Sequence, residues 1–159
     1  MLVGIIIGAV VLLLIIFVIS SYNKLVKRKV NVEEAFATMD VYLKKRFDLI
    51  PNLVETVKGY AKHESETLIA VIEKRGSNYD SMTEEQKIES GAAISSVIPN
   101  IMALAESYPD LKANQNFMNL SNQLEAVEED IANSRKYYNG TVKRYNMSVQ
   151  TIPTNIIAG

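Results

Sequence analysis

An apolar run at the start of the sequence constrains the fold more than any other feature. Residues 1–23 contain no Asp, Glu, Lys, Arg or His, and Leu2 to Ile19 read LVGIIIGAVVLLLIIFVI. A helix of about 20 such residues crosses the ~30 Å hydrocarbon core of a bilayer. A helix that is apolar on every face fits the surface of a soluble domain poorly. Residues 1–22 are therefore predicted to form a transmembrane anchor.

A secretory signal peptide is the alternative interpretation of this run. Such peptides begin with a positively charged region and end in a small-residue cleavage site of the A-x-A type. Here Met1 leads directly into apolar sequence, and the run ends in Ser20-Ser21-Tyr22-Asn23. These departures favour an anchor that is retained.

Four basic residues follow the run directly: Lys24, Lys27, Arg28 and Lys29. Basic residues beside a membrane span remain on the cytoplasmic side, so the N-terminus is predicted outside and the following domain inside. The same charges are candidate contacts for anionic lipid headgroups. The topology signal alone, however, accounts for them.

Gly4 and Gly8 form a G-x-x-x-G pattern within the run. Small residues at this spacing let two helices approach closely in lipid. They are therefore candidate helix-association residues, and they favour a homo-oligomer. The pattern also occurs by chance in apolar segments.

Residues 23–159 are predicted to form one helical domain. Apolar residues recur at three- and four-residue steps, most strongly from Phe117 to Val149, and no stretch shows sustained strand alternation. Short connections make neighbouring helices antiparallel. The predicted fold class is all-α, with an N-terminal transmembrane helix followed by an antiparallel up-and-down four-helix bundle.

Proline, glycine and capping residues set the expected helix ends. Pro51 is expected to end the first helix, with Asp48 capping a second one that stops before Gly76. Pro99 is expected to kink or split the third helix, whereas the fourth is expected to continue through Gly140. The remaining signals are a capping box from Thr83 to Gln86, a stop at Tyr108-Pro109, and a cap at Asn114 or Asn116.

No pattern of catalytic or metal-binding residues appears in the chain. There is no cysteine, and the one histidine, His63, follows Tyr60 rather than a glutamate at the three-residue spacing of di-metal bundles. Neither an enzyme activity nor a cofactor is predicted. An enzyme that uses an unrecognised carboxylate site ranks third, after the two functions given below. A net charge of −1 gives no general attraction to nucleic acid. Tyr138 and Tyr145 fall at core positions, which favours packing over base stacking.

Two segments resemble the signature of the bacterial LemA family: LKKRFDLIPNLVETVKGYA from Leu43 to Ala61, and YPDLKAN from Tyr108 to Asn114. Asn116-Phe117, Ile131-Ala132, Tyr138-Asn139, Tyr145-Asn146 and Pro153 continue the resemblance, while Phe36 replaces the family's tryptophan. The resemblance implies a single-pass protein of the bacterial cytoplasmic membrane with a helical bundle. It implies no activity and no catalytic residue. A membrane metallopeptidase is a partner that it suggests.

These features predict a membrane-anchored, non-enzymatic scaffold that self-associates and contacts membrane lipids. The alternative is a monomeric adaptor that regulates a membrane protease or transporter. The size of the protein in detergent distinguishes the two hypotheses.

An interhelix polar pair is also predicted. If the first and fourth helices are antiparallel neighbours, Asn23 lies level with Asn139 or, one to two turns away, with Asn146. An amide–amide bond would then join the helices. The alternative is that these asparagines face water.

Overall fold

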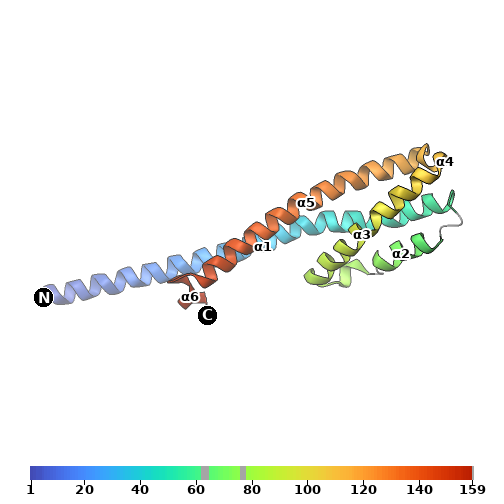
Figure 1. Cartoon of the computed structure of the whole chain (residues 1–159). Helices are drawn as coiled ribbons and strands as arrows, with labels where there is room; N and C mark the ends of the chain where they lie inside the picture. Colours follow the sequence, from blue (N-terminus) through green and yellow to red (C-terminus); the bar gives the residue numbers. More distant parts are fainter. Residues whose placement is uncertain (62–64, 76–77, 159) are drawn as a thin grey trace. The chain divides into compact units, whose positions relative to one another are not determined.

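The computed structural model describes residues 1–61, 65–75 and 78–158. Every regular element in these ranges is helical, which confirms the all-α class (Figure 1). The antiparallel four-helix arrangement stays a prediction. In chain order the elements are α1 (Leu2–Lys58), α2 (Ser65–Arg75), the short 3-10 helix η1 (Tyr79–Ser81), α3 (Glu84–Ser107), α4 (Pro109–Lys112), α5 (Gln115–Gln150) and α6 (Thr154–Ala158).

The chain divides into two compact units. Unit 1 comprises Met1–Ala37 and Arg135–Gly159, and unit 2 comprises Thr38–Ser134. Helices α1 and α5 each contribute to both units. The expected boundary between residues 22 and 23 falls inside α1, and the division into an anchor (1–22) and one domain (23–159) stays a prediction.

The expected helix end at Pro51 is wrong, because α1 continues through this residue to Lys58. Proline lacks an N–H group and so leaves the carbonyl of Phe47, four residues earlier, without its helical donor. Arg75 of α2 replaces that donor: its Nε donates to Phe47 O at 2.9 Å. The guanidinium also lies 3.7 Å from the centroid of the Phe47 ring. This long-range bond compensates for the lost helical one, so the helix persists.

The second helix accordingly begins at Ser65 and not near Asp48, and it ends at Arg75. Gly76, at which it was expected to stop, and His63 lie outside the described residues. The other punctuation signals are largely confirmed. Thr83 and Gln86 form both bonds of the capping box, and α3 ends before Tyr108. Pro99 does not split α3.

Helix α5 begins where its cap predicts and is continuous through Gly140, as expected. The side-chain oxygen of Asn114 accepts a hydrogen bond from the backbone N–H of Phe117 at 3.0 Å. This bond satisfies one of the free donors at the helix start and so identifies Asn114 as the cap.

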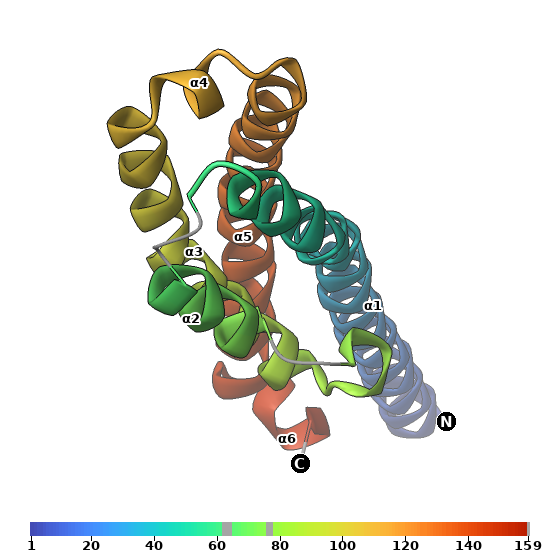
Figure 2. The same ribbon diagram turned by 90° about the vertical axis from the view of Figure 1, so that its right-hand side faces the viewer.

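Unit 2 contains a core of buried apolar side chains from α1 to α5. Within this unit α2 and α3 lie side by side (Figure 2). The apolar positions predicted to repeat along the helices provide most of this core, which includes Met39, Leu43, Ile50, Val54, Val57, Leu68, Val71, Ile94, Ile101, Leu111, Phe117, Leu124, Val127 and Ile131.

In unit 1, α1 and α5 pack against each other. The guanidinium of Arg28 donates to the backbone carbonyl of Arg144 at 3.0 Å. The rings of Phe36 and Tyr138 meet edge to face, with centroids 5.8 Å apart. Thr141 and Ser148 are buried on α5, and each hydroxyl donates to a carbonyl of its own helix. These short, internally bonded side chains allow close packing without unsatisfied polar groups.

Candidate functional site

The first part of α1 is an exposed apolar helix. Every residue of the segment Leu2–Ile19 is exposed in the structure. By length and composition α1 qualifies as a candidate membrane span, with none of its apolar window buried. Among the described residues α3 passes the same test, but it contributes Ile94, Val97 and Ile101 to the core of unit 2. A core helix explains α3, whereas the apolar part of α1 has the length and composition of a membrane anchor or of a signal sequence.

We call the exposed apolar segment Leu2–Ile19, which is predicted to anchor the chain, the anchor segment. Its two glycines have open surroundings. A Cβ added at Gly4 or at Gly8 meets no atom within 4 Å. A helix from a second molecule therefore has access to this face, which is the condition that the G-x-x-x-G hypothesis requires. The association itself stays a prediction.

The four basic residues after the anchor segment differ in their environments. Lys24, Lys27 and Lys29 are exposed, whereas Arg28 is half-buried and binds the backbone of α5. Arg28 thus helps to join α1 to α5, which the sequence did not predict. Lys29 also lies 4.0 Å from the carboxylate of Glu33, and the contact of the lysines with lipid headgroups stays a prediction.

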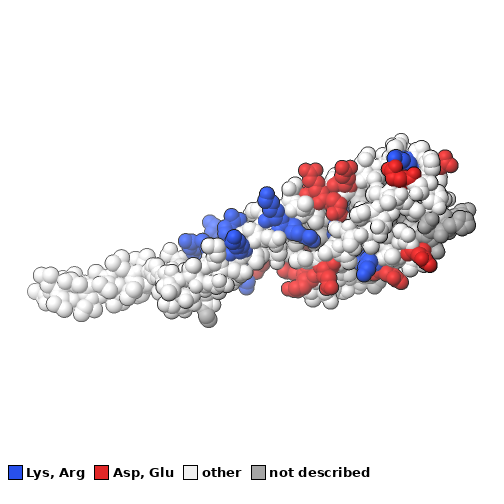
Figure 3. All heavy atoms as spheres, in the orientation of Figure 1, with Lys and Arg blue, Asp and Glu red and all other residues white. Residues whose placement is uncertain are grey.

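The two units carry opposite charges. By sequence, unit 1 contains eight lysines and arginines but two acidic residues, Glu33 and Glu34, whereas unit 2 contains nine basic and sixteen acidic residues. Half of the basic residues in unit 1 belong to α5, which has no acidic residue after Asp130. Figure 3 shows lysines and arginines gathered beside the uncharged anchor segment. The part of unit 1 outside the predicted membrane span is therefore strongly basic.

The predicted polar pair is not joined by any hydrogen bond that we identify among the described residues. Asn23 is exposed on α1, and Asn139 and Asn146 are exposed on α5. This exposure suits the alternative in which all three amides face water. The pairing stays a prediction.

A buried arginine lies at the centre of unit 2. The side chain of Arg46 is fully buried. Its Nη1 donates to Glu128 at 2.5 Å and to Ser95 at 2.6 Å, and its Nη2 donates to the Gly91 carbonyl at 2.6 Å. Ser95 also donates to the second carboxylate oxygen of Glu128 at 3.3 Å. One charged cluster therefore links α1, α3 and α5.

Gly91 is needed for this arrangement. A Cβ at this position would lie 2.9 Å from a methyl carbon of Leu43 and 3.0 Å from Nη2 of Arg46. Both contacts are closer than side chains normally allow. The glycine thus gives the guanidinium access to the α3 backbone.

Sequence reasoning missed the Arg46 cluster, although a signal was present. Arg46 lies three residues after Leu43 and four before Ile50, at the spacing of the buried face of α1. A charged residue at such a position requires a partner of opposite charge. Only the fold shows that Glu128 is this partner.

A second polar cluster surrounds the buried Tyr79. Its hydroxyl donates to Asp40 Oδ1 at 2.6 Å, and Lys87 pairs with the other carboxylate oxygen at 2.8 Å. Burial, together with the hydrogen bond to Asp40, raises the pKa of Tyr79 well above its ordinary value. The tyrosine therefore stays protonated and acts as a structural hydrogen-bond donor.

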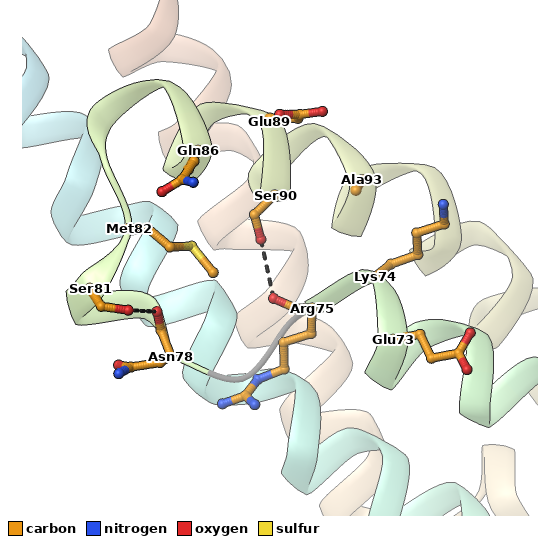
Figure 4. A pocket seen from close by; sticks show the side chains of 10 residues that line it. All are labelled: Glu73, Lys74, Arg75, Asn78, Ser81, Met82, Gln86, Glu89, Ser90 and Ala93. Atoms are coloured by element: carbon orange, nitrogen blue, oxygen red, sulfur yellow. Dashed lines mark hydrogen bonds between the residues drawn. The ribbon is translucent and has the colours of Figure 1, made fainter.

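A shallow groove of about 540 Å³ lies between the end of α2 and the start of α3. Figure 4 shows the Ser90 hydroxyl directed at the Arg75 carbonyl, with which it forms a hydrogen bond of 3.2 Å. Within the described ranges no group of three His, Cys, Asp or Glu side chains is placed to hold a metal ion. The groove carries no arrangement that indicates a specific reaction.

Comparison with known proteins supports the family resemblance. The sequence model of the LemA family matches residues 35–159. The chain is also similar to a protein of Metamycoplasma hominis named Protein LemA, with 25% identity over 138 residues. The similarity covers 86% of this chain and 63% of that protein, so the chain spans less than two thirds of the length of this relative.

Proposed function

This chain belongs to the LemA family, and we propose that it is a membrane-anchored, non-enzymatic scaffold that self-associates at the bacterial cytoplasmic membrane. The observation that carries the proposal is the exposed apolar segment Leu2–Ile19 of α1. A continuous apolar surface of this length is unfavourable in water and requires a cover. A lipid bilayer has the matching thickness.

The basic residues after the anchor segment support a cytoplasmic location for the helical part of the chain. Lys24, Lys27 and Lys29 are exposed directly after the apolar segment. The positive-inside rule keeps such residues on the cytoplasmic face.

The proposal includes an antiparallel up-and-down arrangement of the helices. Two contacts in unit 1 support it, because Arg28 faces Arg144 whereas Phe36, later in α1, faces Tyr138, earlier in α5. In unit 2 the ion pair between Arg46 and Glu128 joins the same two helices.

Self-association is tested by the size of the full chain in mild detergent. Gly4→Leu combined with Gly8→Leu should reduce the oligomer to a monomer, because the added side chains fill the space for a neighbouring helix. Val10→Leu combined with Val11→Leu is the matched control, since it changes the same apolar segment outside the G-x-x-x-G pattern. The control should leave the oligomer intact.

A wild-type chain that is monomeric both in detergent and after cross-linking in membranes would reject the scaffold. That result would favour the alternative, a monomeric adaptor for a membrane protease or transporter. An oligomer that survives both double variants would move the association surface away from the glycines.

The proposed orientation is tested with a single cysteine. The natural chain has none, and Ser96 is exposed on α3. Ser96→Cys should be protected from an impermeant thiol reagent in intact cells and should react after permeabilisation. Efficient reaction in intact cells would reverse the orientation.

A further inference from the structure

The short helix α6 lies beside the point at which the anchor segment ends. Ile157 and Ala158 line a small cavity of about 200 Å³ together with Tyr22, Val26 and Tyr145. Tyr22 follows the last residue of the apolar run, Ile19, by three positions. If the run spans a bilayer, α6 is therefore at the level of the lipid headgroups.

Two large apolar side chains close to Ile157 in the sequence are exposed. Ile152 is 82% exposed and Ile156 is 78% exposed, while Ile157 packs towards α1. Apolar side chains at a membrane surface are stabilised when they enter the boundary between headgroups and acyl chains. A bilayer at the end of the anchor segment provides this cover.

Positive charge accompanies the exposed isoleucines. We call the exposed side chains of Lys24, Lys27, Lys29, Lys143 and Arg144 the basic cluster. The cluster combines residues of α1 and α5, and no acidic residue follows Asp130 in the sequence. Basic residues beside a membrane attract anionic lipid headgroups. The charge of unit 1 thus complements an anionic bilayer and would oppose a basic partner.

We propose that residues 152–158 insert into the surface of an anionic bilayer, with the basic cluster holding the headgroups around them. The proposal rests on the membrane anchoring proposed above. It gives unit 1 a second bilayer contact in addition to the span. Two contacts on different helices restrict the tilt of the α1–α5 pair relative to the bilayer, which a single span leaves free.

The test uses the full chain in vesicles and a single fluorescent reporter. The natural sequence has no tryptophan, so Ile156→Trp introduces one at the proposed insertion site. Ile69→Trp is the matched control, because Ile69 is also an exposed isoleucine but lies on α2 in unit 2. In vesicles containing lipid brominated close to the headgroup, Ile156→Trp should be quenched several-fold more strongly than the control.

A charge comparison tests the basic cluster. Anionic vesicles should quench Ile156→Trp more than neutral vesicles do, and adding Lys143→Gln with Arg144→Gln should abolish this difference. Lys45→Gln with Lys74→Gln removes two exposed charges from unit 2 and should leave the difference unchanged.

Three results would overturn the proposal in distinguishable ways. Equal quenching of the two reporters, in a chain that floats with the vesicles, would reject insertion while leaving the anchor in place. Quenching that does not respond to headgroup charge would reject the role of the basic cluster. A chain that fails to float with vesicles would reject the anchor, and the insertion with it.

Discussion

Replacing Glu128 with leucine should destabilise unit 2 through the buried charge that is left behind. Glu128 accepts a hydrogen bond from the fully buried Arg46 side chain, and its own side chain is 32% exposed. After the substitution, Ser95 and the Gly91 carbonyl remain as partners, but neither carries a charge. Losing one member of a buried ion pair costs about 3–5 kcal/mol. Because Glu128 is partly exposed to water, we expect a cost near the lower end, about 3 kcal/mol.

The second step removes the stranded charge. Arg46→Met replaces the guanidinium with an apolar side chain of similar length, and the partly exposed Glu128 then turns towards solvent. The double variant with Arg46→Met and Glu128→Leu should therefore be more stable than Glu128→Leu alone. The expected coupling energy between the two positions is about 1–3 kcal/mol.

Urea unfolding of the full chain in detergent, followed by circular dichroism, measures these free energies. In thermal unfolding, a cost of about 3 kcal/mol should lower Tm by about 6–12 °C for a chain of this size. The ion pair between Lys112 and Glu106 is the control, since it is also a close pair, at 2.8 Å, but both of its side chains are exposed. Lys112→Met and Glu106→Leu should show a coupling below about 0.5 kcal/mol.

The buried-charge reasoning fails if Glu128→Leu costs no more than Glu106→Leu. It also fails if the double variant at Arg46 and Glu128 is less stable than Glu128→Leu alone. Such results would mean that water reaches Arg46 and solvates it without Glu128.

Three further predictions test other contacts. Gly91→Ala, at a position without room for a Cβ, should cost about 1–3 kcal/mol in thermal unfolding. Gly140→Ala should instead stabilise by about 0.5–1 kcal/mol, because a Cβ at this position of α5 makes only an ordinary contact, 3.9 Å from Nη2 of Arg144. Equal effects of the two substitutions would contradict the packing. The pKa of Tyr79 is raised in the folded state, so folding disfavours the tyrosinate form. The contribution of Tyr79 to stability is therefore complete below pH ~10 and is lost as the pH rises further. Tyr79→Phe should therefore flatten the decline of the urea midpoint above that pH, and an unchanged slope would argue against it. Thr83→Ala removes the capping box and should cost about 1 kcal/mol, against a change within about 0.5 kcal/mol for the exposed Ser96→Ala.

Sequence reasoning identified those features of the candidate site that depend on neighbouring residues, and it missed those that depend on distant ones. The anchor segment, the glycine pair and the basic residues after it were all identified from the sequence, because each depends on composition within a few turns of one helix. The contribution of the basic residues of α5 to the same surface was not identified. It depends on the hydrogen bond from Arg28 to the backbone of Arg144, two residues that are far apart in the chain.

The all-helical class, the start of α3 at its capping box and the continuity of α5 through Gly140 were predicted correctly from the sequence. These features follow from periodicity and from hydrogen bonds within one turn. The passage of α1 through Pro51 and the place of Arg46 in the core were not predictable in this way, because both depend on contacts between distant residues. In the first case Arg75 supplies the missing donor across 28 residues, and in the second Glu128 supplies the opposite charge across 82. A local rule fails where a distant side chain satisfies the group that the rule leaves unpaired.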